Sequence, residues 1–253
     1  MTMVALPAGW SLAAFDAVES TNDEAIGRAE QGAAEGTVVW GRQQLAGRGR
    51  RGRNWQSPVG NMYASVVVRP QCPPDQAAQL GFVTAIAVGE TAAALLPPGH
   101  RITYKWPNDV QVDGGKIAGI LLESSPGADG KVDYVVIGTG INVAWQPPSG
   151  ETAYAVSSLA GLGAATTVEQ VLEGYCANLD RWIGVWRRDG FAAVRSAWLA
   201  RAGNLGQVID VKAGQESCRG RFAQLDDSGA LILELEGGAI RRITAGEIFP
   251  AAA

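Results

Sequence analysis

Hydrophobic positions in residues 1–203 follow two spacings, and these spacings predict the secondary structure. Short runs rich in β-branched and aromatic residues and bounded by Gly, Pro or Asp are typical of strands. They predict strands over residues 11–18, 37–44, 61–69, 101–106, 109–112, 116–124 and 132–143. Apolar residues repeated every three or four positions indicate helices with one buried side. They predict helices over residues 20–31, 75–96, 168–186 and 191–202.

The first helix has a recognisable start and end. Thr21 and Glu24 have the spacing of a capping box, in which a hydroxyl and a carboxylate satisfy free N–H groups at the helix start. Gly32 is the residue type that commonly follows a helix end. We therefore expect Thr21 to cap this helix.

The pattern changes after Gly203. Residues 207–212, 217–225, 230–235 and 239–244 are short alternating segments separated by Gly or Asp turns. Such a series of short strands is typical of a small all-β barrel. The sequence therefore predicts an α+β protein with two domains, residues 1–203 and residues 204–253.

Composition and charge exclude several classes of protein. The 253-residue chain has 47% hydrophobic residues and a net charge of −4, so its surface as a whole does not favour nucleic acid. The three cysteines form no CxxC pair, which argues against a zinc site or a disulfide framework and fits the cytoplasm. We see no signal peptide at residues 1–10 and no apolar run of membrane-spanning length.

The sharpest motif is the arginine loop, residues 47–53, with the sequence Gly-Arg-Gly-Arg-Arg-Gly-Arg. Its four arginines repel one another, so an ordered loop needs an anion between them. Guanidinium groups bind phosphates and carboxylates through two parallel hydrogen bonds. Taken alone, the motif is equally compatible with a solvated surface loop or an RGG-like RNA-binding segment.

Two further motifs lie on predicted strands. Residues 105–109 read Lys-Trp-Pro-Asn-Asp, and Lys116 opens the apolar run that ends at Glu123. A lysine inside a buried strand is costly unless it meets an anion, so Lys116 is a candidate ligand-binding residue. Lys105 is equally well explained as a side chain reaching solvent. Asn108 and Asp109 either hold a magnesium-bound phosphate or cap the turn, and the turn is the simpler interpretation.

The third motif, Gly138-Thr139-Gly140-Ile141-Asn142, ends a predicted buried strand and allows a ligand to lie against the backbone. It lacks the third glycine of a dinucleotide fingerprint, and the chain has no P-loop. His100, the single histidine, is better explained as structural, and no Ser-His-Asp or Cys-His set is evident. These absences favour catalysis by positioning and charge stabilisation, as in phosphoryl and adenylyl transfer.

Taken together and in this order, the motifs resemble those of the biotin protein ligase family. The matching segments are residues 20–22, 44–53 with Trp55, 105–109, 115–123 and 138–142. The resemblance implies a mixed, mainly antiparallel sheet flanked by helices, followed by a C-terminal SH3-like barrel. It also implies an enzyme that forms biotinoyl-AMP from biotin and ATP and then biotinylates a lysine of a carrier protein.

The same resemblance implies a role for individual residues. Contacts to biotin are expected from Ser20, Thr21, Asn22, Gln44, Arg48, Gly49, Arg50 and Lys116. Contacts to the nucleotide are expected from Arg50, Arg51, Arg53, Trp55, Asn108, Lys116 and Asn142. The catalytic groups would be Lys116, Arg50 and Arg48, with Lys116 bridging the biotin carboxylate and the α-phosphate. No protein-bound metal is expected, and Mg²⁺ would accompany ATP.

The resemblance also bears on partners. The acceptor would be the biotin carboxyl carrier protein of acetyl-CoA carboxylase or a related carboxylase, and a homodimer is compatible with the family. Residues 20–22 start too early in the chain to leave room for a winged helix-turn-helix, so we expect no binding to operator DNA. The lack of an apolar run of membrane-spanning length predicts no membrane association. The alternatives are a lipoate or octanoate ligase or transferase of the same fold and, from another class, an RNA-binding module.

Overall fold

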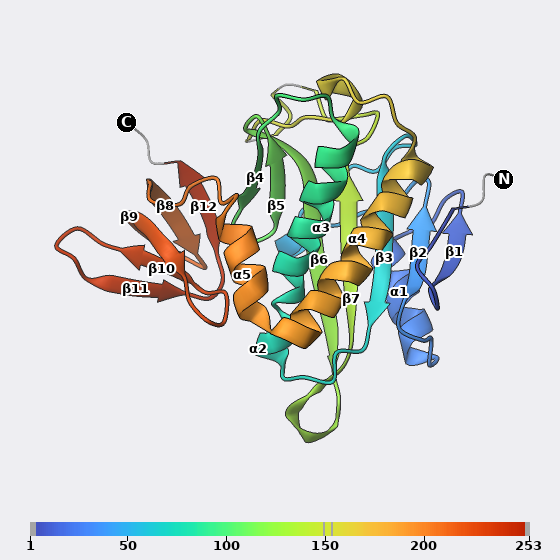
Figure 1. The fold of residues 1–253 in the computed structure, drawn as a ribbon, viewed down its shortest axis with the longest axis horizontal. Helices are drawn as coiled ribbons and strands as arrows, with labels where there is room; N and C mark the ends of the chain where they lie inside the picture. Colours follow the sequence, from blue (N-terminus) through green and yellow to red (C-terminus); the bar gives the residue numbers. More distant parts are fainter. Residues whose placement is uncertain (1–3, 149, 153, 251–253) are drawn as a thin grey trace.

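A computed structural model describes residues 4–148, 150–152 and 154–250. Its larger part is built on a seven-stranded sheet (Figure 1). The strands are β1 (Ser11–Phe15), β2 (Thr37–Gly41), β3 (Met62–Val68), β4 (Ile102–Lys105), β5 (Asp109–Val112), β6 (Gly115–Pro126) and β7 (Val132–Ile141). Their order is β1-β2-β3-β7-β6-β5-β4, with β1 and β2 parallel and the other neighbours antiparallel. The mixed, mainly antiparallel sheet is therefore confirmed.

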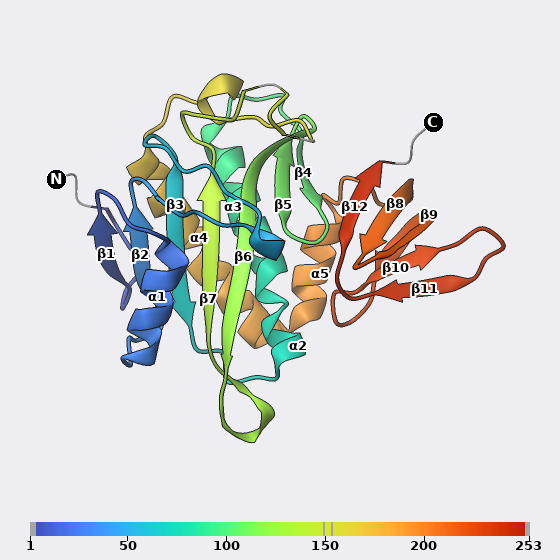
Figure 2. The same ribbon diagram turned by 180° about the vertical axis from the view of Figure 1, so that it is seen from behind.

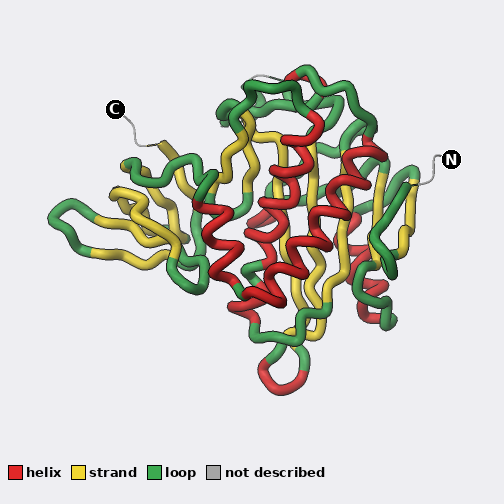
Figure 3. The backbone as a smooth tube through the Cα atoms, viewed as in Figure 1, coloured by secondary structure: helices red, strands yellow, loops and turns green. Residues whose placement is uncertain are grey.

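Helices cover both faces of this sheet. α3 (Leu80–Leu95), α4 (Val168–Asp189) and α5 (Phe191–Leu199) lie on one face, and α1 (Thr21–Glu30) lies on the other (Figures 1 and 2). The arginine loop crosses the face that carries α1, in front of β6 and β7 (Figure 2). The β6–β7 hairpin projects beyond the sheet at the end opposite the long loop that follows β7 (Figure 3).

Side chains of the central strands alternate between two cores, as the period of two in a strand requires. Val38 and Trp40 of β2 pack in the large core with α3 and α4, whereas Val39 points to a smaller core beneath α1. Val67 and Val136 also belong to this smaller core. Each fully buried side chain of this kind contributes about 1.5–3 kcal/mol, so α1 is held firmly against the sheet.

Two helix predictions need correction. Ser20, not Thr21, caps α1, with its hydroxyl accepting from the Asp23 N–H at 3.4 Å, because the Thr21 hydroxyl donates to Gln44 instead. The single helix predicted over 75–96 is two helices, α2 (Pro74–Ala77) and α3, separated by tighter i→i−3 bonds such as Gln79 N–H to Gln76 O. The stretch Pro74–Leu95 is apolar and long enough to cross a membrane, but 67% of its apolar window is buried inside the fold.

The C-terminal part is a separate five-stranded antiparallel sheet. Its strands are β8 (Val208–Ala213), β9 (Glu216–Leu225), β10 (Leu231–Glu234), β11 (Ile240–Ile243) and β12 (Glu247–Pro250). β12 was not predicted from the pattern because it is short and ends in proline. The order β11-β10-β9-β8-β12 leaves β11 and β12 as the two edges, so closure into a barrel is not confirmed.

Direct contacts dock this sheet against the larger part. The Trp106 indole N–H donates to the Gly229 carbonyl at 3.2 Å, and the Arg195 guanidinium of α5 donates to the Leu225 carbonyl at 3.2 Å. A Cβ on Gly229 would lie 2.6 Å from the Phe82 ring, so this turn approaches α3 as closely as glycine permits. The docking carries the start of β12 to the edge of the cavity described next.

Candidate active site

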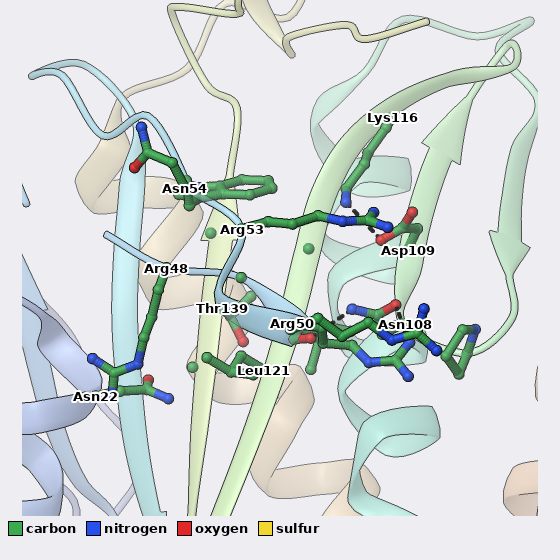
Figure 4. Close-up of a pocket in the computed structure, with 18 of the residues that line it drawn as sticks. Asn22, Arg48, Arg50, Arg53, Asn54, Asn108, Asp109, Lys116, Leu121 and Thr139 are labelled. Atoms are coloured by element: carbon green, nitrogen blue, oxygen red, sulfur yellow. Dashed lines mark hydrogen bonds and ion pairs between the residues drawn. The ribbon is translucent and has the colours of Figure 1, made fainter. Parts of the chain in front are cut away.

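The sequence motifs converge on one cavity on the α1 face of the sheet. Its wall is made by the start of α1, the arginine loop, the β5–β6 hairpin, the glycine-rich part of β7 and residues 246–247 before and in β12 (Figure 4). Of the residues predicted to bind biotin or nucleotide, those that line it are Ser20, Thr21, Asn22, Gln44, Arg48, Gly49, Arg50, Arg51, Arg53, Trp55, Asn108 and Lys116. Asn142 does not line this cavity.

One end of the cavity carries uncharged hydrogen-bonding groups, and the arginine beside them, Arg48, is paired with carboxylates of the chain. The Gln44 side-chain oxygen accepts from the Thr21 N–H at 2.9 Å and from the Thr21 hydroxyl at 3.0 Å. The Ser65 hydroxyl lies 2.6 Å from the Asn22 side-chain oxygen. A Cβ on Gly138 would lie 2.1 Å from that same oxygen, which explains the glycine at this position. This end suits a ligand with neutral donors and acceptors.

The opposite end is cationic and centres on Lys116 at the start of β6. Lys116 is 8% exposed, and its ammonium lies 2.7 Å from an Asp109 carboxylate oxygen. The ammonium also lies 5.2 Å from the ring centres of both Trp55 and Tyr154, close enough for a cation–π attraction. Figure 4 shows Lys116 and Asp109 beside Arg53, far from Asn22. Lys116, which the sequence predicts to face a ligand, is buried and lines this cavity.

Lys105 is a second buried lysine, and sequence reasoning missed it as a site residue. It is 9% exposed, lines the cavity, and lies 5.8 Å from the Tyr154 ring centre and 5.4 Å from the Phe249 ring centre. Burial lowers its pKa, although Asp109 and Glu247 act in the opposite direction. The signal that identified Lys116, a lysine within a strand pattern, applied equally to Lys105.

The arginine loop is folded, and carboxylates of the chain itself supply the anions it needs. Arg48 pairs with Asp23 and Glu123, and Arg53 pairs with Glu247. The loop is closed by backbone bonds from Gly49 N–H to Arg53 O at 2.7 Å and from Trp55 N–H to Gly47 O at 2.9 Å. Hydrogen bonds from Arg48 to Asp23 raise the pKa of Arg48 and lower that of Asp23.

Arg50 differs from Arg48 and Arg53 because its hydrogen-bond partners are neutral. Its guanidinium donates to the Asn108 side-chain oxygen at 3.2 Å and to the Gly246 carbonyl at 3.3 Å. Burial, reinforced by the charge of Arg51, lowers its pKa. Arg50 and Lys105 are thus cations that the cavity holds without an ion pair among the described residues. An anionic ligand would relieve both.

Trp55 forms a partition in the site. Its indole lies against Gly119 of β6 and Gly140 of β7, where a Cβ would approach the ring to 2.9 Å and 2.6 Å. Beyond it lies a second cavity lined in part by Lys116, Asn142, Glu151 and Tyr154. The two cavities therefore share a common wall, formed by Asn54, Trp55, Lys116 and Tyr154.

Two asparagines hold the ends of the loop that supplies Tyr154. The Asn142 side-chain amide donates to the Ser157 carbonyl at 3.0 Å and to the Lys116 carbonyl at 3.4 Å, so the chain itself uses its N–H donors. Asn61, which sequence reasoning missed, is 1% exposed and accepts the N–H groups of Val143, Ala144 and Trp145 at 2.8, 3.1 and 3.0 Å. No short motif marks Asn61, because its partners lie far away in the sequence.

Other candidate chemistry is absent from the described part of the chain. No three His, Cys, Asp or Glu side chains there are grouped to hold a metal ion. His100 pairs with Asp113 at 2.6 Å, a surface contact outside both cavities. Cys176 is fully buried, and burial raises the pKa of its thiol to about 12, so it packs rather than reacts.

Comparison with known proteins gives this arrangement a family. The model of the biotin/lipoate A/B protein ligase family matches residues 53–200, and that of the biotin protein ligase C terminal domain matches residues 205–249. A biotin--[acetyl-CoA-carboxylase] ligase of Paracoccus denitrificans is 42% identical over 235 residues, covering 91% of this chain and 97% of the relative. The chain belongs to the biotin protein ligase family.

Other members of the biotin protein ligase family agree in sequence and in fold. The bifunctional ligase/repressor BirA of Escherichia coli is 30% identical over 254 residues, covering 95% of this chain and 74% of the relative. The biotin protein ligase of Aquifex aeolicus in complex with biotin and ATP superposes with a TM-score of 0.80 at 25% identity, covering 94% of this chain and 97% of that one.

Proposed function

We propose that this chain is an ATP-dependent biotin protein ligase. It would form biotinoyl-5′-AMP from biotin and ATP and then transfer the biotinoyl group to a lysine of a biotin carboxyl carrier protein. One observation supports this most strongly: a single cavity has a neutral hydrogen-bonding end and a cationic end. Biotin has the same division, with a neutral ureido ring at one end and a carboxylate at the other.

The neutral end is assigned to the ring of biotin. Buried or partly buried donors and acceptors are available there from Ser20, Thr21, Asn22 and Gln44. These groups can form hydrogen bonds with a polar ring, which would otherwise lose free energy on leaving water. A ligand lying along β7 from this end would direct its carboxylate towards Lys116. Gly49 and Arg50 of the arginine loop lie over this path and would exclude water from the adenylate.

The cationic end is assigned to the reacting anions. In the first step a carboxylate oxygen attacks the α-phosphorus and pyrophosphate leaves, so two negatively charged groups must approach each other. Lys116, Arg50 and Lys105 can neutralise this charge in a largely buried setting, where such interactions are strongest. In the second step the lysine amine of the carrier attacks the acyl carbon of the mixed anhydride, AMP leaves, and the amine releases a proton.

The nucleotide is assigned to the region around Trp55 and the second cavity. Trp55 offers an aromatic face, and Asn142 keeps hydrogen-bonding capacity beyond its bonds to the chain. Arg51, Arg53 and Asn108 line the phosphate side. Mg²⁺ enters this proposal as the ion carried by ATP, where it would screen the leaving pyrophosphate.

Four further proposals concern the acceptor, the C-terminal sheet, the oligomeric state and the location. The acceptor would be the carrier domain of acetyl-CoA carboxylase or a related biotin-dependent carboxylase, which matches the name of the 42% identical relative. The C-terminal sheet would correspond to the SH3-like barrel, and a homodimer would be compatible with the fold. A cytoplasmic location would suit three free cysteines.

Acid-dependent exchange between pyrophosphate and ATP tests the proposal. The purified chain is incubated with ATP, Mg²⁺ and labelled pyrophosphate, with biotin, lipoate or octanoate as the acid. Biotin should support exchange at micromolar concentration, and the other two acids should not. Exchange driven by lipoate or octanoate but not by biotin would refute the proposal in favour of a lipoate or octanoate ligase.

A further inference from the structure

Arg48 lines the cavity, but its charge is already balanced by the protein. Its guanidinium donates to both Asp23 oxygens, one of them at 2.6 Å, and to the two Glu123 oxygens at 3.2 and 3.1 Å. A further contact joins it to the Ser20 hydroxyl at 3.3 Å. One cation therefore faces two carboxylates. The charge of Arg48 therefore attracts an incoming anion only weakly, in contrast to that of Arg50, whose hydrogen-bond partners are neutral.

Glu123 connects this arginine to the neutral end of the cavity. Its Oε2 accepts from the Asn22 amide at 2.6 Å, so one carboxylate holds both Asn22 and Arg48. Asn22 is 4% exposed, and its side-chain oxygen faces Ser65 and Gly138. The bond to Glu123 therefore fixes which way the Asn22 amide points. Figure 4 shows Arg48 and Asn22 side by side, away from Lys116 and Arg50.

The three groups come from three separate elements. Asn22 belongs to α1, Arg48 to the arginine loop and Glu123 to the middle of β6, where the strand is paired with β7. Glu123 does not itself line the cavity. Its side chain lies on the same face of β6 as Leu121, which does line the cavity, and joins the arginine loop to α1 at the edge of the ring end.

We propose that Glu123 is a positioning residue that fastens the arginine loop to the ring end of the cavity through Arg48 and Asn22. The inference rests on the function proposed above and deepens it. With Glu123 in place, the orientation that Asn22 presents to the ring and the closed position of the loop support each other. Without the charge of Glu123, Arg48 keeps only its contacts with Asp23 and Ser20, and both ring binding and retention of the adenylate weaken.

Glu123→Gln is the sharpest test because it changes one oxygen to a nitrogen. The amide oxygen can still accept from Asn22, but the amide nitrogen faces Arg48 with a donor instead of an acceptor. Loss of one charge-assisted contact of this kind changes an equilibrium by roughly ten- to a hundredfold. We expect the KM for biotin and the rate of biotinoyl-AMP release to rise by about tenfold or more, with the KM for ATP unchanged.

The control is Asp23→Asn, which removes the other carboxylate of Arg48 but leaves the Asn22–Glu123 bond. Asp23 is more exposed than Glu123, with 55% against 32% of the side chain accessible, so its loss should have a smaller effect on biotin KM. Thermal unfolding of each variant checks that the fold survives. Equal effects of the two substitutions, or normal biotin KM and adenylate release in Glu123→Gln, would reduce Glu123 to a structural role and overturn the proposal.

A second variant keeps the test independent of how Glu123→Gln folds. Arg48→Gln cuts the same contact from the loop side and should also raise adenylate release, while the double variant should be no worse than Arg48→Gln alone. Additive effects in the double variant would contradict the shared contact. Failure of the proposed function would appear differently, as wild-type protein that makes no adenylate from biotin and ATP.

Discussion

Replacing Lys116 by methionine tests the charge that the proposed reaction needs most. Methionine keeps an unbranched side chain between the Trp55 and Tyr154 rings, so the packing of the wall should persist. The change removes the ammonium that would face the biotin carboxylate and the α-phosphate. It also leaves the Asp109 carboxylate, whose side chain is 15% exposed, without the partner that now lies 2.7 Å away.

Coulomb's law gives the order of magnitude of the effect for a charge in contact with an anion. Two unit charges about 4 Å apart at an effective dielectric constant of about 20 interact by about 4 kcal/mol. Loss of such an attraction in the transition state corresponds to a decrease of about a thousandfold in rate. The unpaired Asp109 adds repulsion to the same place. We therefore expect adenylate formation in Lys116→Met to fall by roughly a hundred- to a thousandfold.

Biotin-dependent exchange of pyrophosphate with ATP, measured at saturating substrates, gives this rate directly. Lys131→Met is a matched control, because Lys131 is exposed on the loop of the β6–β7 hairpin and should leave exchange unchanged. The double variant Lys116→Met/Asp109→Asn should recover about tenfold of the lost rate, since it removes the added repulsion. Near-normal exchange in Lys116→Met, with an unchanged unfolding temperature, would refute the charge-neutralisation argument.

Three other variants probe separate parts of the structure. Arg50→Gly removes a guanidinium that holds the loop to Asn108 and Gly246, so biotinoyl-AMP should escape from the site. The escape would be seen as labelling of lysines on a bystander protein such as serum albumin. Unchanged selectivity for the acceptor would count against closure of the loop over the adenylate. Gly138→Ala places a methyl group where only 2.1 Å separates it from the Asn22 oxygen and should raise biotin KM at least tenfold, with ATP KM as the internal control. Burial would raise the pKa of Asp226, but hydrogen bonds from Ser228, Arg242 and backbone N–H groups lower it to about 2. The ionised Asp226 therefore contributes about 1–2 kcal/mol to the free energy of unfolding, after allowance for solvent, and this contribution is present above pH 4 and lost as the pH falls towards 2. The free energies of unfolding of Asp226→Asn and wild type, measured in urea, should differ at pH 7 and converge near pH 2.

The sequence predicted the parts of the site that depend on local pattern. Lys116 stood out because a charge at the start of an apolar strand has few structural explanations, and the arginine loop stood out by composition. Thr21 was misassigned as a helix cap because the Gln44 side chain, distant in sequence, occupies its hydroxyl. The break near Gln79 escaped notice because the helical pattern of hydrophobic residues continues through it.

Other features could not be predicted because they depend on contacts between distant segments. Asn61 acts on backbone groups more than eighty residues away, with a separation of 82 positions to Val143. Glu247 reaches Arg53 across 194 positions, from a strand too short to be recognised by its alternation. The carboxylates that balance the arginine loop were likewise hidden, because their distance from the loop in the chain gives no hint of their proximity in space.

The contacts from Arg53 to Glu247 and from Arg50 to the Gly246 carbonyl also order events during synthesis. On a ribosome, the arginines emerge nearly two hundred residues before the partners that hold them, as the separations of 194 and 196 positions require. Until β12 docks, Arg53 lacks its ion-pair partner and Arg50 lacks its bond to residue 246. Asp23 and Glu123, the carboxylates that balance Arg48, lie far closer to the loop in the chain. The seating of β12 therefore completes the contacts of Arg50 and Arg53 with residues 246 and 247 in one step.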